Sequence, residues 1–136
     1  MMKQFTLTAL LVIASLSAYC GSAVPPAIMT AFNKEYAQNA TNPTWIQQNN
    51  GMWQVSYRQG NAQMSITFLP SGQWKEIAKI IPDEQLPDVT RNYLKANVKG
   101  HISQSTAIVV ADGSTVYRVH AGNKDYNFDD NGKLVQ

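Results

Sequence analysis

Cysteine, histidine and charged residues are all scarce in this chain of 136 residues. It has one cysteine and two histidines, and only 15% of its residues are charged, with a formal net charge of +2. A lone cysteine cannot form a disulfide within the chain, so stability has to come from a hydrophobic core. The small, evenly spread positive charge gives no electrostatic reason to expect nucleic-acid binding.

Sequence patterns that support catalysis are missing as well. A nucleophile needs an adjacent base, and acid–base catalysis needs positioned titratable groups. The two histidines, His101 and His120, lie at an expected helix end and on an expected strand. No serine occurs in a GxSxG nucleophile elbow. We therefore expect a protein that is not an enzyme and has no cofactor.

Long apolar runs are absent except near the N-terminus. Lys3 precedes an apolar run at residues 7–16, and small residues follow up to Ala23. This is the anatomy of a secretory signal peptide, and the run is too short to be a membrane-spanning helix. The sequence predicts a signal peptide over residues 1–23 and an exported mature chain, periplasmic or secreted, without a transmembrane helix.

The position of signal cleavage depends on Cys20. Cleavage after Ala23, with Gly21 as the second small residue, leaves a mature chain without cysteine. Cleavage before Cys20 would allow lipidation and anchoring at the outer membrane, although the bulky Tyr19 does not suit that signal. The first interpretation is preferred, and lipidation of Cys20 is the alternative.

The first half of the mature chain predicts one helix and four strands. Proline suits a first helical turn, and Ile28, Phe32 and Tyr36 then recur with helical spacing. Beyond Pro43, apolar and polar residues alternate in runs separated by glycine-containing turns, as in strands with one buried face. The expected strands are 44–48, 53–58, 63–68 and 73–81.

The second half repeats this pattern. Phe68 and Gly72 recur 60 positions later as Phe128 and Gly132. The helix restarts after residues 86–87, with an expected buried face of Val89, Tyr93 and Ala96 or Asn97, and Gly100 is the expected C-terminal glycine. The expected strands are 102–111, 115–121, 124–129 and 133–136.

The predicted fold class is α+β, built of two helix-plus-four-strand repeats. Short turns between consecutive strands favour antiparallel pairing, and helices with one apolar stripe must cover a sheet face. We expect one antiparallel sheet with both helices on the same face. The mature chain, 24–136, is then a single domain made of repeats 24–81 and 82–136.

The order of these aromatics and turn glycines resembles a known family. The series runs from Val24-Pro25 through Trp45, Val55-x-Tyr57-x-x-Gly60, Phe68-x-x-x-Gly72-x-Trp74 and Tyr117-x-Val119-x-x-Gly122 to Tyr126-x-Phe128-Asp129-x-Asn131-Gly132. It is similar to the β-lactamase-inhibitor-like, PepSY-like family of exported bacterial proteins. The resemblance implies a fold like that of β-lactamase inhibitory protein and an extracytoplasmic location. It does not imply β-lactamase inhibition, because function does not follow from fold.

The best candidate site is the polar face of the expected sheet. If the aromatic residues face the helices, then Arg58, Arg118 and His120 lie on the opposite face, where they could dock a protein or peptide. Trp45 and Trp74 are candidate aromatic anchors, since tryptophan is enriched at interface hot spots. The alternatives are a solvated sheet face and tryptophans that pack at the sheet ends.

One acidic segment, residues 129–132, has the sequence Asp-Asp-Asn-Gly. With Asp125 upstream it could offer oxygen ligands to calcium. However, it lacks the distal glutamate of an EF-hand loop. Asp, Asn and Gly are also the residues that a tight turn requires. The preferred interpretation is a turn, with no metal site.

Overall fold

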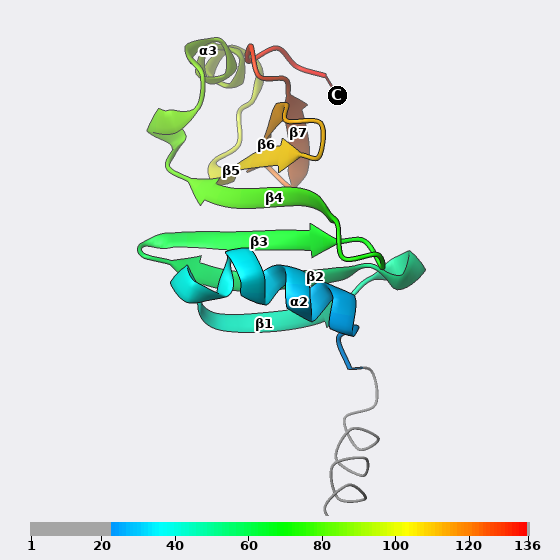
Figure 1. The fold of residues 1–136 in the computed structure, drawn as a ribbon. Helices are drawn as coiled ribbons and strands as arrows, with labels where there is room; N and C mark the ends of the chain where they lie inside the picture. The colour runs from blue at the N-terminus through cyan, green and yellow to red at the C-terminus, as the bar shows by residue number, and fades with distance from the viewer. Residues whose placement is uncertain (1–22, 136) are drawn as a thin grey trace, which may run out of the picture.

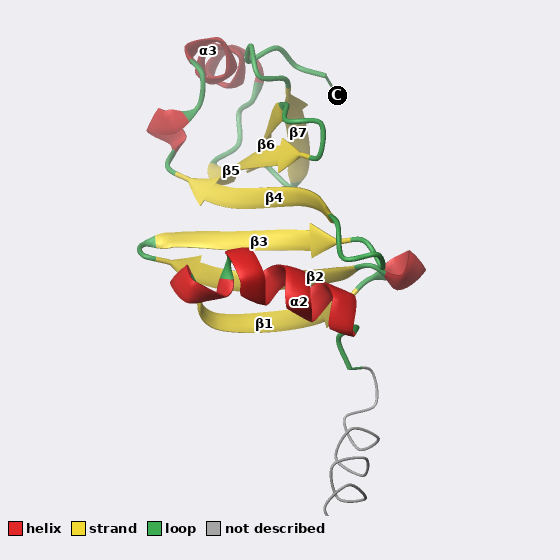
Figure 2. Cartoon of the chain, viewed as in Figure 1, coloured by secondary structure: helices red, strands yellow, loops and turns green. Residues whose placement is uncertain are grey.

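The computed structural model describes residues 23–135. The predicted signal peptide, including Cys20, therefore lies outside the described residues apart from Ala23. The described chain forms one seven-stranded antiparallel sheet and two ten-residue helices (Figures 1 and 2). The elements are α2 (Pro26–Glu35), β1 (Thr41–Gln47), β2 (Trp53–Gln59), β3 (Ala62–Phe68), β4 (Trp74–Ile81), α3 (Asp88–Asn97), β5 (Ile102–Val110), β6 (Thr115–Ala121) and β7 (Lys124–Phe128), with 3-10 turns η1 (Ala37–Asn39), η2 (Asn49–Gly51) and η3 (Asp83–Gln85).

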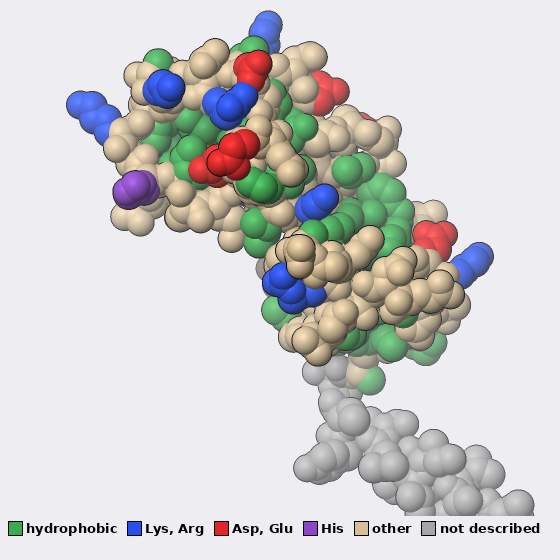
Figure 3. All heavy atoms as spheres, turned by 90° about the vertical axis from the view of Figure 1, so that its left-hand side faces the viewer, with side chains coloured by type: hydrophobic (Ala, Val, Ile, Leu, Met, Phe, Trp, Pro, Cys, Tyr) green, Lys and Arg blue, Asp and Glu red, His purple; other side chains and the backbone are tan. Residues whose placement is uncertain are grey.

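The strands pair in chain order, β1 to β7, and every pairing is antiparallel. We call α2 with β1–β4 the first unit and α3 with β5–β7 the second unit. Strands β4 and β5 join them over six paired positions, from Glu76↔Val110 to Ile81↔Ser105. The sheet is strongly twisted, and each unit forms one lobe of the molecule in Figure 3.

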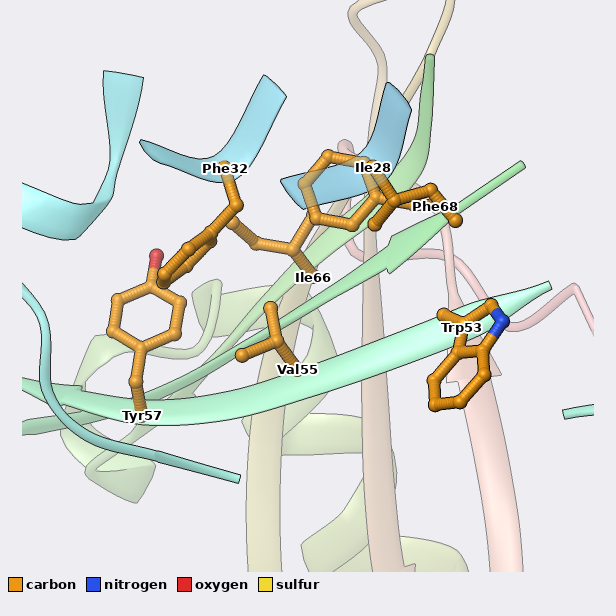
Figure 4. Close-up of a cluster of buried hydrophobic side chains, with 7 residues drawn as sticks. All are labelled: Ile28, Phe32, Trp53, Val55, Tyr57, Ile66 and Phe68. Atoms are coloured by element: carbon orange, nitrogen blue, oxygen red, sulfur yellow. The ribbon is translucent and has the colours of Figure 1, made fainter. Parts of the chain in front are cut away.

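In the first unit, α2 buries one side on the sheet. Ile28 and Phe32 are one helical turn apart and are almost fully buried against β2 and β3. Figure 4 shows both side chains pointing from α2 towards the strands. The helix begins at a proline, whose fixed φ and missing N–H suit this position. The buried cluster consists of Ile28, Phe32, Trp53, Val55, Tyr57, Ile66 and Phe68.

The second unit buries α3 in the same way. Leu94 packs with Val119 of β6 and Phe128 of β7, and the ring of Tyr93 meets that of Phe128 edge-on at 5.7 Å. Residues that pair across neighbouring strands lie on the same face of the sheet. The pairs Ile66↔Ile77, Ile81↔Ser105 and Ser105↔Val119 therefore share one face, because Ile77 and Ile81 point to the same side of β4. Both helices therefore cover one face, and the predicted fold class is confirmed.

The second helix buries a different side from the one predicted. Thr90 and Leu94 are the buried residues of α3, whereas Val89 is 52% exposed, so its predicted burial is wrong. Ile28 and Phe32 thus correspond to Thr90 and Leu94, 62 positions later. The Thr90 hydroxyl donates to the Gly132 carbonyl at 3.1 Å, which explains how a polar residue is accommodated there.

The second unit has three strands among the described residues instead of four. The expected strand at 133–136 is represented by a single bridge, Phe128↔Leu134, and by the Val135 N–H donating to the Asn127 carbonyl. The whole described sheet therefore has seven strands.

Gly100 does not end the second helix. Helix α3 ends at Asn97 with Val98 as its C-cap, and Gly100 lacks the positive φ of a C-terminal glycine. It is required for a close approach of two backbones instead. A Cβ at this position would lie 2.7 Å from the Cα of Gly122 in the β6–β7 turn.

The turn that follows β3 packs on the start of α2. Gly72 has φ +96°, and a Cβ there would lie 2.8 Å from the carbonyl oxygen of Ala27. Gly132 makes the corresponding contact in the second unit, against Pro87, Val89 and Thr90. The repeated glycine that is visible in the sequence thus lets each turn touch the first turn of its helix.

We expect Leu94→Ala to lower the free energy of unfolding by about 2–5 kcal/mol, because it leaves a cavity in the second cluster. Val89→Ala, on the same helix but exposed, should change it by no more than about 0.5 kcal/mol. Denaturant unfolding of both variants measures this. A larger loss from Val89→Ala than from Leu94→Ala would contradict the observed helix orientation.

We further expect Gly72→Ala to destabilise the protein more than Gly113→Ala. Gly113 also has a positive φ, +93°, but nothing lies within 4 Å of its Cβ position. Gly113→Ala should therefore cost about 1–2 kcal/mol of backbone strain alone. Gly72→Ala should add about 1–3 kcal/mol for the clash with Ala27. Equal melting temperatures for the two variants would show that this contact contributes nothing.

Candidate functional site

The face of the sheet opposite the helices, which we call the open face, has no helix of residues 23–135 packed on it. Alternation along each strand assigns its side chains, because residues next to each core position point to the other side. Arg58, Arg118 and His120 lie here as predicted. Further polar residues on this face are Gln54 and Ser56 of β2, Gln63, Ser65 and Thr67 of β3, and Asp125 and Asn127 of β7. The register adds residues from the other strands: Thr44, Ile46, Glu76, Ala78, Ile80, Gln104, Thr106 and Ile108.

A shallow hollow of about 260 Å³ lies on the open face. Its middle is lined by small side chains, because Ser56 pairs with Ser65 across the strands and Ser65 pairs with Ala78. Longer side chains, among them Gln63 and Ile80, surround these small ones. The depression therefore results from three adjacent strands carrying small residues in register.

Two arginines occur on the open face, but they are far apart. Arg118 lines the hollow, and its Nε donates to Asn127 Oδ1 at 3.0 Å. Arg58 lies near the β2–β3 turn, where its guanidinium donates to the Asn61 carbonyl at 3.2 Å. Strands β2 and β6 are four strand spacings apart, about 19 Å. The two arginines thus stand towards opposite sides of the sheet and do not form one cluster.

His120 and Asp125 form a cross-strand pair at the β7 side of the open face. Their side chains are 46% and 57% exposed, and His120 Nδ1 lies 2.7 Å from Asp125 Oδ1. The Ser103 hydroxyl donates to the backbone carbonyl of His120 rather than to its ring. The pair therefore has the geometry of a surface ion pair and is not aligned with a serine as in a catalytic triad.

The two candidate anchors, Trp45 and Trp74, lie on the helix-covered face. Trp45 pairs with Val55, and its ring meets that of Phe32 edge-on at 5.3 Å. Trp74 pairs with Phe68 and packs against the same cluster. Both are partly buried. The structure therefore separates the tryptophans from Arg58, Arg118 and His120, which lie on the open face.

Aromatic rings continue around α2 on the helix-covered face. Phe32 meets Tyr57 edge-on at 5.7 Å and stacks with Tyr36 at 6.3 Å. Burial raises the pKa of Tyr57, and the neighbouring Tyr36 hydroxyl raises it further. Burial also raises the pKa of Tyr36, with an added contribution from Glu35. Both phenols are thus held in their neutral form, which suits a packing role.

The acidic segment forms a turn. One carboxylate oxygen of Asp129 accepts hydrogen bonds from the backbone N–H groups of Asn131 and Lys133, both at 2.9 Å. This use of an aspartate side chain is typical of an Asx turn. Among residues 23–135, no group of three potential metal-ligating side chains occurs.

Taken together, the fold is an open antiparallel sheet with helices on one face. Crystal structures of three similar chains from Bacteroides share it, with 15–18% sequence identity. A protein described as putative periplasmic, from Bacteroides eggerthii, matches with a TM-score of 0.75 over 85% of this chain and 88% of its own. A DUF2874 family protein from Bacteroides uniformis matches with 0.74 over 84% and 88%. A protein like β-lactamase inhibitory protein, from Bacteroides fragilis, matches with 0.65 over 88% and 89%.

The sequence also matches the profile of a family described as "Putative beta-lactamase-inhibitor-like, PepSY-like" over residues 51–136, more than half of the chain. The chain belongs to this family, as the order of aromatics and glycines predicts. No curated protein matches it. Neither helix in the described part of the chain has the length and hydrophobicity of a membrane-spanning segment.

Proposed function

We propose that this protein is an exported, non-enzymatic binding module that docks a protein or peptide on its open face. The observation that carries the proposal is the hollow between Gln54, Ile80 and Arg118, on a face that neither helix covers. Membership of an inhibitor-like family supports a role in binding another protein. It does not identify the target.

The chemistry of the hollow supports binding. Its small central side chains leave room for a protruding group of a partner, and Ile80 offers apolar contact beside it. Ile80 is 39% exposed, which is high for a large apolar side chain in a sheet. Arg118 provides a guanidinium that can pair with a carboxylate.

The described residues also support a role without catalysis. His120 is partnered by Asp125 on the surface, and no pairing brings it to a nucleophile. Asp129 uses its carboxylate in a turn. With these titratable groups engaged in local structure, the open face offers contact surface and charge rather than an acid–base pair.

Export is part of the proposal. The N-terminal pattern of the sequence and the description of the Bacteroides eggerthii relative both support a periplasmic or secreted protein. The alternative function is that of a structural envelope protein anchored through lipidated Cys20. The mass of the mature N-terminus distinguishes a lipidated Cys20 from an unmodified start at Val24.

We expect the wild-type chain to capture a specific partner from an extract of the cell envelope. The double variant Arg58→Glu with Arg118→Glu should abolish capture, because it reverses both positive charges of the open face. Ser65→Trp should also abolish it by filling the hollow, without changing the net charge. Both variants should fold, since the changed side chains face solvent or the hollow.

Matched controls carry the same changes on the helix-covered side. Lys34→Glu with Lys99→Glu alters the net charge equally, and Asn33→Trp adds an exposed tryptophan on α2. These controls should capture the partner like the wild type. The open-face proposal fails if the open-face variants keep the partner, or if the controls lose it to the same extent.

A further inference from the structure

A second and larger hollow, of about 800 Å³, lies on the second unit, away from the open face. It runs beside α3, between this helix, η3 and the start of β5. Its volume is within the range of small-ligand sites. Figure 3 shows this side of the molecule: in the upper lobe, hydrophobic side chains lie between acidic side chains and a group of basic ones.

The floor of this α3 hollow is apolar. Leu94 lies on α3, Val98 is the C-cap residue of this helix, and Ile102 lies at the start of β5. Leu94 is almost fully buried, whereas Val98 and Ile102 are partly exposed. Val98 and Ile102 therefore provide apolar surface beside the helix that a ligand can contact.

The two ends of the hollow carry opposite charges. Asp83 and Glu84, on η3, lie near the N-terminal end of α3. The Ser105 hydroxyl donates to Asp83 at 2.8 Å and fixes the position of the acidic end. Lys95, in the last turn of α3, and His101 line the other end.

The two other charged residues that line the hollow pair with each other. Arg91 pairs with Asp88 one turn away on the same helix, so neither offers an unbalanced charge to a ligand. What remains is an acidic end, an apolar floor and a basic end. Such an arrangement is complementary to a ligand with an ammonium group at one end, an apolar middle and a carboxylate at the other.

We propose that the α3 hollow binds a short peptide of about three residues with free termini. The ammonium group would pair with Asp83 and Glu84, and the carboxylate with Lys95 and His101. From Asp88 to Lys95 the helix rises about 10.5 Å. Three extended residues span at most about 10–11 Å, so the free ends of such a peptide match the charged ends of the hollow. This site is independent of the open face.

The test is titration of the ¹⁵N-labelled mature protein with the tripeptide Ala-Leu-Ala, followed by NMR. Saturable shifts are expected at the amides around η3, Lys95 and His101, with a Kd below about 1 mM. N-acetylation or C-amidation of the peptide should each weaken binding about fivefold, because each removes one ion pair.

Protein variants test the two ends separately. Glu84→Gln should weaken binding of the free peptide about fivefold and reduce its sensitivity to N-acetylation. Lys95→Met should weaken binding about fivefold and reduce its sensitivity to C-amidation. Lys34→Met, in the last turn of α2, is the matched control and should change nothing. The proposal is overturned if the peptide gives no saturable shifts, or if both capped peptides bind as well as the free one. It is also overturned if these amides shift with protein concentration alone, because the hollow is then a contact between two copies of the chain.

Discussion

The structure depends on one constraint: the helices cover only one face of the sheet. Successive strand residues point to opposite faces, so every strand has to place apolar side chains on the helix side and tolerate water on the other. Val55 and Ile66 are fully buried beneath α2, and Val119 and Phe128 are fully buried in the second cluster. Burial of each such side chain contributes about 1.5–3 kcal/mol, which must replace the disulfides that this chain cannot form.

The same constraint produces the open face. Because neither α2 nor α3 packs there, most of its residues are free of the demand for volume that the core imposes. Small residues can therefore lie side by side on neighbouring strands and leave a hollow, as Ser56, Ser65 and Ala78 do. The same small residues on the helix-covered face would leave a destabilising cavity in the core. The candidate binding surface is thus a consequence of the one-sided architecture.

The alternation of residues and the turn glycines made much of this fold predictable. They predicted the face of Val55, Tyr57 and Phe128, the antiparallel pairing and the open-face position of Arg118 and His120. The register shift of α3 was not predictable, because Val89 is more apolar than Thr90. Only the hydrogen bond from Thr90 to Gly132 shows why the threonine is inside.

Other features of the candidate sites could not be predicted from the sequence, because they depend on contacts between residues that are distant in the chain. Trp45 and Trp74 are predicted as binding residues because tryptophan is common at interfaces. Their strand partners, Val55 and Phe68, place them on the helix-covered face instead. The α3 hollow has no signature in the sequence, since it is made by η3, α3 and β5 together. Gly100 is predicted to end the second helix, which is wrong: it lies beyond the C-cap Val98, and its role is to let two backbones approach at Gly122.

The most direct test of the one-sided architecture compares neighbouring positions on one strand. Single cysteines at Ser65 and at Ile66 of β3, in a Cys20→Ser background, would be reacted with a thiol reagent under native conditions. Cys at position 65, where Ser65 is partly exposed, should react in the folded protein, whereas Cys at position 66, where Ile66 is fully buried, should react only on unfolding. Equal protection at both positions would contradict the account, because it would mean that the open face is covered.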